Sequence, residues 1–362
     1  MNEIQDSKKA YLVLSNGSVY EGTRIGSERD SIGELVFTTG MTGYLETLSD
    51  PSYCGQIVMH TFPLIGNCGV ISSDFEGKPA VKGYVVRELC DAPSNFRSEG
   101  KLEKFLIEND IPGICGIDTR ELTRTIREEG VMNAMICSEV PSDLSEIRSY
   151  AVKNAVATVT SGEKEVYPPE GEKKYRVALM DYGAKSNIIR SLQQRGCEVT
   201  CFPHDTKAEE VLAMNPDGIM LSNGPGDPEE NVVPIAELKK MIGKVPIFGI
   251  CLGHQITALA MGGKTIKLKY GHRGANQPVK NLKGGRTYIT SQNHGYAVVS
   301  DSLKGIGHET FTNANDQTCE GMEYPDKKCF TVQFHPEACG GPCDTSFLFD
   351  NFIKMMGGEQ DA

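Results

Sequence analysis

The chain of 362 residues is long enough for two domains, and its composition is that of a folded globular protein. Hydrophobic residues make up 39% and charged residues 23%, which excludes a disordered chain, a collagen-like chain and a coiled coil. With 37 Lys and Arg against 48 Asp and Glu, the net charge is −11, and no long basic run is present. Nucleic acid is therefore not an expected partner.

Twelve cysteines are scattered along the chain without the dense spacing of a disulfide framework. The first residues contain no apolar stretch of signal-peptide length, and no apolar run approaches the roughly 18 residues that span a bilayer. We therefore expect a cytoplasmic protein with reduced thiols and no membrane association. Most of the cysteines should be small buried hydrophobic residues.

The first 160 residues predict a mixed α+β domain. Short β-type runs flank Asn16-Gly17, the strongest hairpin signal in the sequence. Further strands are expected at 35–37 and 56–59. Asp118 and Glu121 have capping-box spacing ahead of an apolar helical pattern. Residues 161–174 are polar and charged and carry two prolines, which predicts a linker between the domains.

From residue 175 to the C-terminus, short apolar runs alternate with helical patterns. Strands are expected at 176–180, 198–202, 218–221 and 245–250. Thr206 and Glu209 have capping-box spacing before one of the helices. This alternation predicts an α/β domain with a parallel sheet covered by helices on both faces. In such sheets ligands bind beyond the carboxyl ends of the strands, so we expect the chemistry at that edge.

The strand at 245–250 leads into Gly249-Ile250-Cys251-Leu252-Gly253, followed by an Ala-rich helical pattern. This is the thiol counterpart of the Gly-x-Ser-x-Gly nucleophile elbow, in which the glycines make room for a strained turn between strand and helix. Cys251 would project at the carboxyl edge of the sheet, beside a helix N-terminus that favours the thiolate. We interpret it as a nucleophile rather than a buried structural cysteine.

A cysteine nucleophile needs a base and a group that orients the base. His335 and Glu337 follow the last β-type run, 329–334, and their spacing of two suits one face of the strand end. His254 is an alternative base, but a base from another strand fits a triad better. The loop 222–228, with two glycines around a proline, is a candidate oxyanion hole.

Three of these motifs together resemble the class I, triad-type glutamine amidotransferases. They are GICLGHQ at 249–255, SNGPGDP at 222–228 and FHPE at 334–337. The likeness runs from about Tyr175 to the end of the chain and implies a flavodoxin-like α/β domain. Six further stretches resemble the carbamoyl phosphate synthetase small-subunit family along nearly the whole chain. They are GELVFTTGMTGYLETLSDPSYCGQIV (33–58), SNFR (94–97), GIDTRELTRTIREEG (116–130), DYGAKSNIIR (181–190), GHRGANQPV (271–279) and SQNHGYAV (291–298).

The resemblance implies roles for individual residues. Cys251 matches the family's nucleophile, His335 its base and Glu337 the orienting group. The positions that contact glutamine match Ser52, Gly224, Gly226, Leu252, Gln255, Asn293, Gly295 and Tyr296. Because Ser52 comes from the N-terminal domain, the resemblance implies an active site partly at the domain interface. Relatives usually continue with Ala-Ser-Pro-Gly-Pro after FHPE, whereas this chain has Ala-Cys-Gly-Gly-Pro-Cys at 338–343, which adds two thiols near the catalytic strand.

The resemblance also implies an activity, that of a glutamine-hydrolysing carbamoyl-phosphate synthase subunit. Such a subunit converts glutamine to glutamate and ammonia through a cysteine thioester. Its partner, the large subunit, combines channelled ammonia with bicarbonate and ATP for pyrimidine and arginine synthesis. No cofactor is expected in this chain, because ATP and a divalent cation are expected only in the large subunit.

Two other patterns do not predict a binding site. The segment 261–265 resembles a P-loop, but Ala258 stands where the first glycine is required and the segment follows a helix rather than preceding one. His335, Cys339 and Cys343 have no second ligand pair for zinc, so no metal site is expected. Two alternative functions stay open, a stand-alone glutaminase or γ-glutamyl hydrolase and a catalytically silent regulatory subunit. The first does not need the N-terminal domain, and the second should lack the nucleophile or the base.

Overall fold

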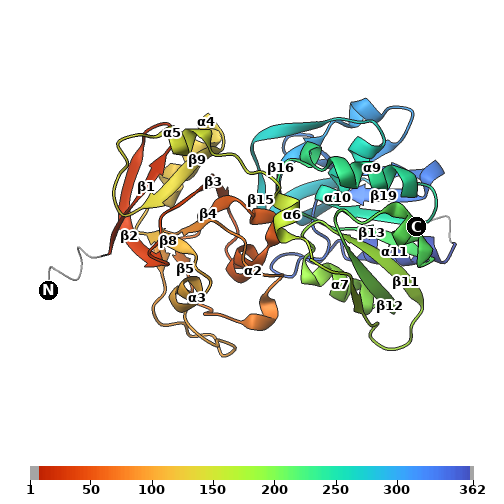
Figure 1. Ribbon diagram of the computed structural model, residues 1–362, viewed down its shortest axis with the longest axis horizontal. Helices are drawn as coiled ribbons and strands as arrows, with labels where there is room; N and C mark the ends of the chain where they lie inside the picture. The colour runs from red at the N-terminus through yellow and green to blue at the C-terminus, as the bar shows by residue number, and fades with distance from the viewer. Residues whose placement is uncertain (1–7, 359–362) are drawn as a thin grey trace. The chain divides into compact units, whose positions relative to one another are not determined.

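The computed structural model describes residues 8–358, and the chain divides into two compact units, Met1–Lys153 and Asn154–Ala362. The first unit runs from red to yellow in Figure 1, and the second runs on through green to blue. No helix among the described residues is long and apolar enough to cross a membrane.

The first unit is built on a closed barrel with the strand order β1-β2-β8-β6-β4-β3-β9. Its strands are β1 (Lys9–Leu14), β2 (Val19–Gly26), β3 (Ser31–Thr38), β4 (Gln56–His60), β6 (Gly83–Val85), β8 (Pro112–Cys115) and β9 (Met132–Cys137), with β5 (Leu64–Ile65) and β7 (Glu88–Leu89) forming a separate pair. Its helices are α2 (Tyr44–Ser49), α3 (Leu102–Glu108), α4 (Thr119–Glu129) and α5 (Ser145–Ser149). The mixed α+β prediction is confirmed, and the closure of the sheet is new.

Two local predictions for this unit are confirmed. β1 and β2 form the predicted antiparallel hairpin, and Gly17 has a φ of +97°, a conformation that glycine adopts without strain. Asp118 caps α4, because its carboxylate accepts hydrogen bonds from the backbone N–H groups of Arg120 and Glu121, each at 3.1 Å.

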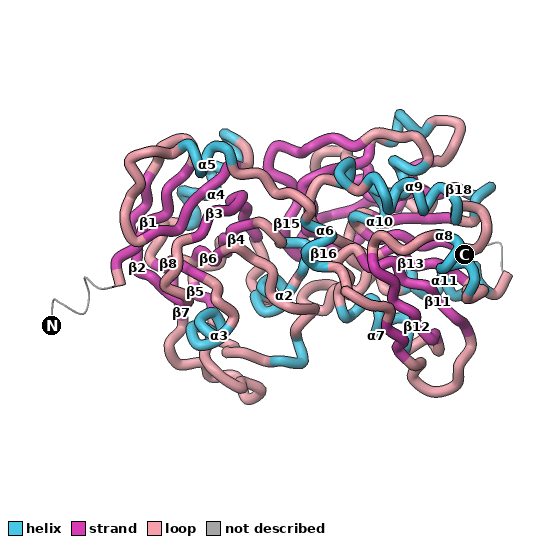
Figure 2. The backbone as a smooth tube through the Cα atoms, in the orientation of Figure 1, coloured by secondary structure: helices cyan, strands magenta, loops and turns pink. Residues whose placement is uncertain are grey.

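The second unit contains one ten-stranded sheet in the order β10-β12-β11-β13-β14-β19-β18-β16-β15-β17. Its strands are β10 (Glu165–Tyr167), β11 (Tyr175–Asp181), β12 (Cys197–Pro203), β13 (Gly218–Leu221), β14 (Ile247–Ile250), β15 (Thr265–Asn281), β16 (Thr287–Val298), β17 (His308–Asn313), β18 (Cys319–Tyr324) and β19 (Cys329–Val332). Its helices are α6 (Ala155–Val159), α7 (Ser186–Gln193), α8 (Ala208–Ala213), α9 (Val232–Met241), α10 (Leu252–Ala260) and α11 (Phe347–Met356). Figure 2 shows the strands of this unit in magenta, flanked by helices in cyan.

The central strands of this sheet are parallel and are covered by helices on both faces, as predicted. β12, β11, β13, β14 and β19 pair in parallel. Along β11, Ala178 and Met180 pack into a core with α8, α9 and α10, whereas Val177 and Leu179 pack into the opposite core with α7 and α11. Successive side chains of a strand point to opposite faces, so a continuous apolar run serves both cores.

The sheet also has an antiparallel half that the sequence analysis did not predict. β18 pairs antiparallel with β19, and β16, β15 and β17 continue the sheet beyond it. The long β15–β16 hairpin has irregular register between Lys267 and His272 and between Gly274 and Gln277. These breaks interrupt the alternation of buried and exposed residues by which strands are predicted.

The predicted linker at 161–174 is wrong. The two units divide between Lys153 and Asn154, ahead of this segment, and β10 within it pairs with β12 at the edge of the second sheet. The backbone N–H of Ser161 also donates to the carboxylate of Asp181 at 2.6 Å. The polarity of the segment is that of a solvated edge strand rather than that of a free connection.

The predicted capping box of Thr206 and Glu209 is also wrong, because α8 begins only at Ala208 and no side chain of its own segment caps it. The carboxylate of Glu237, on α9, instead accepts a hydrogen bond from the Ala208 backbone N–H at 3.0 Å. A tertiary contact has replaced the local cap.

Candidate active site

Cys251 sits in a strained turn between β14 and α10. Its φ of 52° and ψ of −101° lie outside the regions that ordinary residues favour, a conformation that needs support from its surroundings. The Cys251 backbone N–H donates to Val332 O at 2.8 Å, and that of Gly253 donates to Ser222 O at 3.0 Å. The elbow is thus fastened to the strand on each side of β14.

The second glycine of the elbow is required by close packing against β13. A Cβ atom at Gly253 would lie 2.5 Å from the backbone oxygen of Leu221, which cannot move away as a flexible side chain could. The tight approach of α10 to the sheet therefore depends on this glycine.

We expect Gly253→Ala to destabilise the chain by about 1–3 kcal/mol, even though alanine is the better helix former, because of this clash. Thermal unfolding of the purified chain measures the effect. Gly284→Ala is the matched control, since nothing lies within 4 Å of the added Cβ, and should change stability by less than about 0.5 kcal/mol. Equal stability of the two variants would contradict the packing argument.

His335 and Glu337 form a buried hydrogen-bonded pair beyond the end of β19. His335 Nδ1 lies 2.7 Å from Glu337 Oε1, and both side chains are almost completely buried. A carboxylate can only accept, so Nδ1 carries the proton and Nε2 is left with a lone pair for proton transfer. Within residues 8–358, His335 Nε2 has no hydrogen-bond partner. This is the arrangement expected of a general base and its orienting group.

Lys185, which the sequence analysis did not single out, completes this cluster. Its Nζ lies 3.5 Å from Glu337 Oε1 and 3.3 Å from His335 Nδ1, and its side chain is buried. Burial favours the neutral form of Glu337, but the charges of His335 and Lys185 and the hydrogen bond from His335 outweigh it and lower the pKa of Glu337 to about 2. Glu337 is therefore ionised at neutral pH.

The nucleophile and the base follow neighbouring parallel strands. Ile250, the last residue of β14, pairs with Val332, the last residue of β19, so Cys251 and His335 both lie at the carboxyl edge of the sheet. β16 runs past both of them. The Cys251 thiol lies 3.7 Å from Asn293 O, and the His335 backbone N–H donates to Ser291 O at 2.9 Å.

The loop 222–228 lies against the elbow. Asn223 ties it to the segment after β11, because its side chain accepts from the Lys185 N–H at 3.1 Å and donates to Gly183 O at 2.9 Å. A Cβ atom at Gly224 would lie 2.3 Å from Tyr182 O and 2.7 Å from Leu252 Cδ2, so only glycine fits there. As the first residue of α10, Leu252 has a backbone N–H without an acceptor inside the helix.

The remaining predicted glutamine contacts lie in both units. Gln255 is buried on α10 and donates to Tyr296 O and to Gln333 Oε1, each at 2.9 Å. Asn293, Gly295 and Tyr296 lie on β16, and Gly226, with a φ of +86°, lies in the 222–228 loop. Ser52 belongs to the first unit, in the short 3₁₀ segment Pro51–Tyr53. Its contact with glutamine stays a prediction.

His254, the alternative base, is engaged elsewhere. Its Nδ1 lies 2.8 Å from Thr331 Oγ1, and complete burial lowers the pKa of its imidazole to about 3. His254 thus joins α10 to β19. Cys339 and Cys343 are exposed and are not in a disulfide, and Asn187 donates to the Cys339 sulfur at 3.3 Å.

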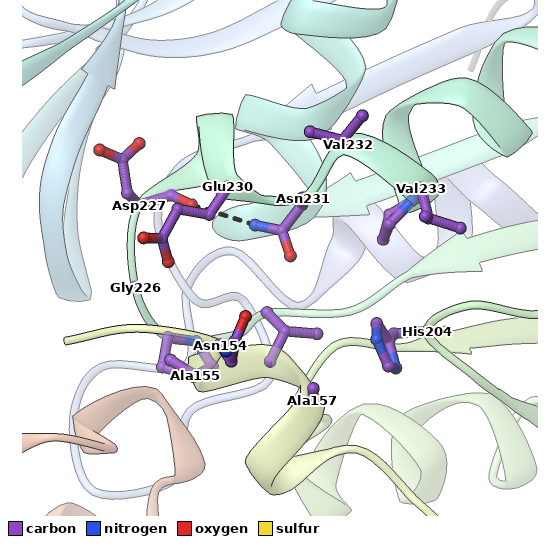
Figure 3. Close-up of a pocket in the computed structure, with 13 residues that line it drawn as sticks. Asn154, Ala155, Ala157, His204, Gly226, Asp227, Glu230, Asn231, Val232 and Val233 are labelled. Atoms are coloured by element: carbon purple, nitrogen blue, oxygen red, sulfur yellow. Dashed lines mark hydrogen bonds between the residues drawn. The ribbon is translucent and has the colours of Figure 1, made fainter.

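A hollow of about 140 Å³ lies on the 222–228 loop, away from the triad. Figure 3 shows that α6, His204 and the segment from Gly226 to Val233 line it, with the Asn231 side chain donating to Asp227 O at 3.1 Å. Cys251, His335 and Glu337 are not among its described lining residues. The hollow therefore borders the loop without being part of the catalytic cluster.

The fold and the site define a class of protein, an α/β enzyme with a cysteine nucleophile at a strand–helix elbow and a His–Glu pair on the neighbouring strand. The sequence matches the family "Glutamine amidotransferase class-I" over residues 178–355 and the family "Carbamoyl-phosphate synthase small chain, CPSase domain" over residues 12–136. The chain belongs to the carbamoyl-phosphate synthase small chain family.

Individual relatives agree with this assignment. The carbamoyl phosphate synthase small chain of Listeria monocytogenes serotype 4b is 50% identical over 360 residues, which is 98% of each chain. That of Staphylococcus saprophyticus is 51% identical over 355 residues, 96% of each chain. A solved structure of a putative GMP synthase component from Thermoplasma acidophilum, 25% identical, covers 52% of this chain and 96% of its own with a TM-score of 0.45.

Proposed function

We propose that this chain hydrolyses glutamine as the small subunit of carbamoyl-phosphate synthase and passes the ammonia to a large subunit. The observation that carries the proposal is the strained Cys251 elbow beside the buried His335–Glu337 pair, in a chain whose relatives match it across both units. The relatives' name, "small chain", supports a large partner subunit that uses the ammonia with bicarbonate and ATP.

The geometry supports a two-step mechanism. The Cys251 thiolate attacks the side-chain amide carbon of glutamine, and the Leu252 N–H with the 222–228 loop stabilises the oxyanion that forms. His335 Nε2 gives a proton to the departing ammonia and then takes one from the water that hydrolyses the γ-glutamyl thioester. Glu337 holds the imidazole in the required tautomer and stabilises its charged form.

The other residues of the site hold these groups and the substrate. We assign glutamine contacts to Gly224, Gly226, Leu252, Gln255, Asn293, Gly295, Tyr296 and Ser52. Lys185 is a positioning residue, because its ammonium keeps Glu337 ionised through the 3.5 Å ion pair. None of these steps needs a cofactor in this chain, and we place ATP and its divalent cation with the large subunit.

The proposal includes the setting of the enzyme. A cysteine nucleophile needs a reducing compartment, and all twelve cysteines are free, which supports a cytoplasmic enzyme serving pyrimidine and arginine synthesis. A stand-alone glutaminase is not favoured, because it would not need the first unit, over which the chain matches the small-chain family. A silent subunit is not favoured either, since the nucleophile and the base are both present.

We expect the isolated chain to hydrolyse glutamine slowly and its large subunit to accelerate the reaction. Ammonia released into water is protonated at neutral pH and loses its nucleophilicity, so uncoupled hydrolysis would waste glutamine. If the two sites are coupled, each ligand changes the affinity of the other by the same factor, typically about 5- to 150-fold. The measurement is the glutaminase rate of the chain alone, with the partner, and with the partner plus ATP and bicarbonate. A fast rate for the chain alone that does not respond to these additions would favour the stand-alone glutaminase.

A further inference from the structure

Three buried side chains from three strands of the antiparallel half converge behind β16. They are His272 on β15, His294 on β16 and Glu320 on β18. The register of the hairpin places His272 opposite His294, with ring centroids 5.0 Å apart. Glu320 Oε1 lies 3.5 Å from His272 Nδ1 and 4.0 Å from His294 Nε2. Among residues 8–358, this is the one group of three such side chains whose ligand atoms all lie within 4.8 Å of one another.

Each imidazole uses its other nitrogen as a hydrogen-bond donor away from the cluster. His272 Nε2 lies 2.8 Å from Asp316 Oδ2, and His294 Nδ1 lies 2.7 Å from Tyr296 O. A carboxylate and a carbonyl can only accept, so these nitrogens carry protons, and a neutral ring then presents a lone pair toward Glu320. Histidines that bind metals nearly always make such a bond from the nitrogen that does not bind the metal.

Glu320 has less support than a buried carboxylate requires. Its side chain is completely buried, and its Oε2 has no hydrogen-bond partner in the part of the chain that the structure describes. Asn313 Nδ2 donates to Oε1 at 3.1 Å. Burial raises the pKa of Glu320, and burial together with the nearby charges of His272 and Arg273 lowers that of His294, which keeps His294 neutral. Neutral imidazole is the form that binds a metal.

We propose that His272 Nδ1, His294 Nε2 and Glu320 bind one divalent transition metal ion, and we expect zinc. Two imidazoles and a carboxylate are a donor set that zinc accepts, and tetrahedral bonds of about 2.0–2.1 Å need donors about 3.4 Å apart, close to the observed separations. The charges of Glu320 and Asp316 balance those of the ion. The ion joins β15, β16 and β18 and so fixes the strand that carries Asn293 and Gly295.

The site was not predicted from the sequence because its ligands have no motif spacing. They come from three strands and meet only through the register of the hairpin and the return of β18. The inference does not depend on the proposed function, since the ion is structural and takes no part in glutamine hydrolysis.

The test is the zinc content and thermal stability of the full chain, purified without a metal-affinity step, titrated with Zn²⁺ and dialysed. We expect one zinc per chain and a lower Tm after chelation, because an ion that binds only the folded state stabilises it. Glu320→Gln should reduce zinc affinity at least tenfold, and Asp316→Asn about 10- to 100-fold, since Asp316 orients His272.

Two control variants separate this site from adventitious binding. His308→Gln changes an exposed histidine on β17 that pairs with Glu323 at 3.2 Å, and Cys339→Ser with Cys343→Ser removes both exposed thiols. Both controls should keep the zinc. X-ray absorption at the zinc edge of the unsubstituted chain should show nitrogen and oxygen ligands, which tests the site even if Glu320→Gln does not fold.

Two results would overturn the inference. The first is a chain that holds no zinc after titration and whose Tm does not respond to zinc or chelator, in which case a proton shared by His272 and Glu320 accounts for the cluster. The second is zinc that survives Glu320→Gln but is lost with the cysteine variant or shows sulfur ligands, which would place the metal on the thiols.

Discussion

Cys251→Ser is expected to reduce glutamine-dependent carbamoyl phosphate synthesis by at least about 10³-fold and to leave ammonia-dependent synthesis by the assembled enzyme intact. Serine fits the elbow, but its hydroxyl is a far weaker nucleophile at neutral pH than a thiolate at a helix N-terminus. Because Cys251 acts only before ammonia is released, supplying ammonia bypasses it. The measurement is the steady-state rate of the complex with each nitrogen source.

Cys343→Ser is the matched control for this experiment, because it makes the same chemical change at an exposed cysteine outside the elbow. It should keep both activities. If Cys251→Ser lost the glutamine and ammonia reactions equally, Cys251 would be needed for assembly or for the synthetase reaction, and its assignment as the nucleophile would be wrong.

His335→Ala should reduce glutamine hydrolysis by about 10²–10⁴-fold, and Glu337→Gln by less, because the two residues have different roles. Alanine removes the group that moves the proton. Glutamine at 337 can still accept a hydrogen bond from His335 Nδ1, now 2.7 Å from the carboxylate, but it stabilises the imidazolium less. Steady-state rates of both variants in the complex measure the difference. A more damaging change at 337 than at 335 would reverse the assigned roles.

Glu337→Gln should also change the pH dependence of stability. The pKa of Glu337 is lowered from 4.5 to about 2 on folding, so its stabilising contribution is present above pH 4.5 and is lost as the pH falls toward 2. The shift corresponds to roughly 3 kcal/mol at neutral pH. The difference in thermal stability between the original chain and the variant should therefore be largest at neutral pH and shrink below pH 4.5. A difference that does not vary with pH would contradict the ionised, paired state of Glu337.

The elements around the nucleophile could be predicted because their signals are local. β13, β14 and α10 follow from short apolar runs, the glycines of the elbow and an Ala-rich helical pattern. The order of strands and helices then predicted that Cys251 and His335 would lie at one edge of the sheet, and the pairing of Ile250 with Val332 puts them on neighbouring strands. Local patterns thus decided the central part of the site.

What the sequence did not predict depends on pairings between distant segments. The barrel closes through parallel pairs such as β4–β6 and β6–β8, whose strands are too short to show a clear period. Lys185 lies in a loop, and only the hydrogen bonds of that loop to Asn223 bring its ammonium to Glu337. The cap of α8 likewise comes from Glu237, on another helix.

The most direct test of the central claim is mass spectrometry of the acyl-enzyme. The full chain with its large subunit is mixed with glutamine, quenched in acid within one turnover, digested and mapped. The account predicts a γ-glutamyl group on the peptide that contains Cys251, lost in Cys251→Ser and accumulating in His335→Ala whenever acylation outlasts thioester hydrolysis. A γ-glutamyl group found instead on Cys339 or Cys343, or glutamine turnover that persists in Cys251→Ser, would contradict it.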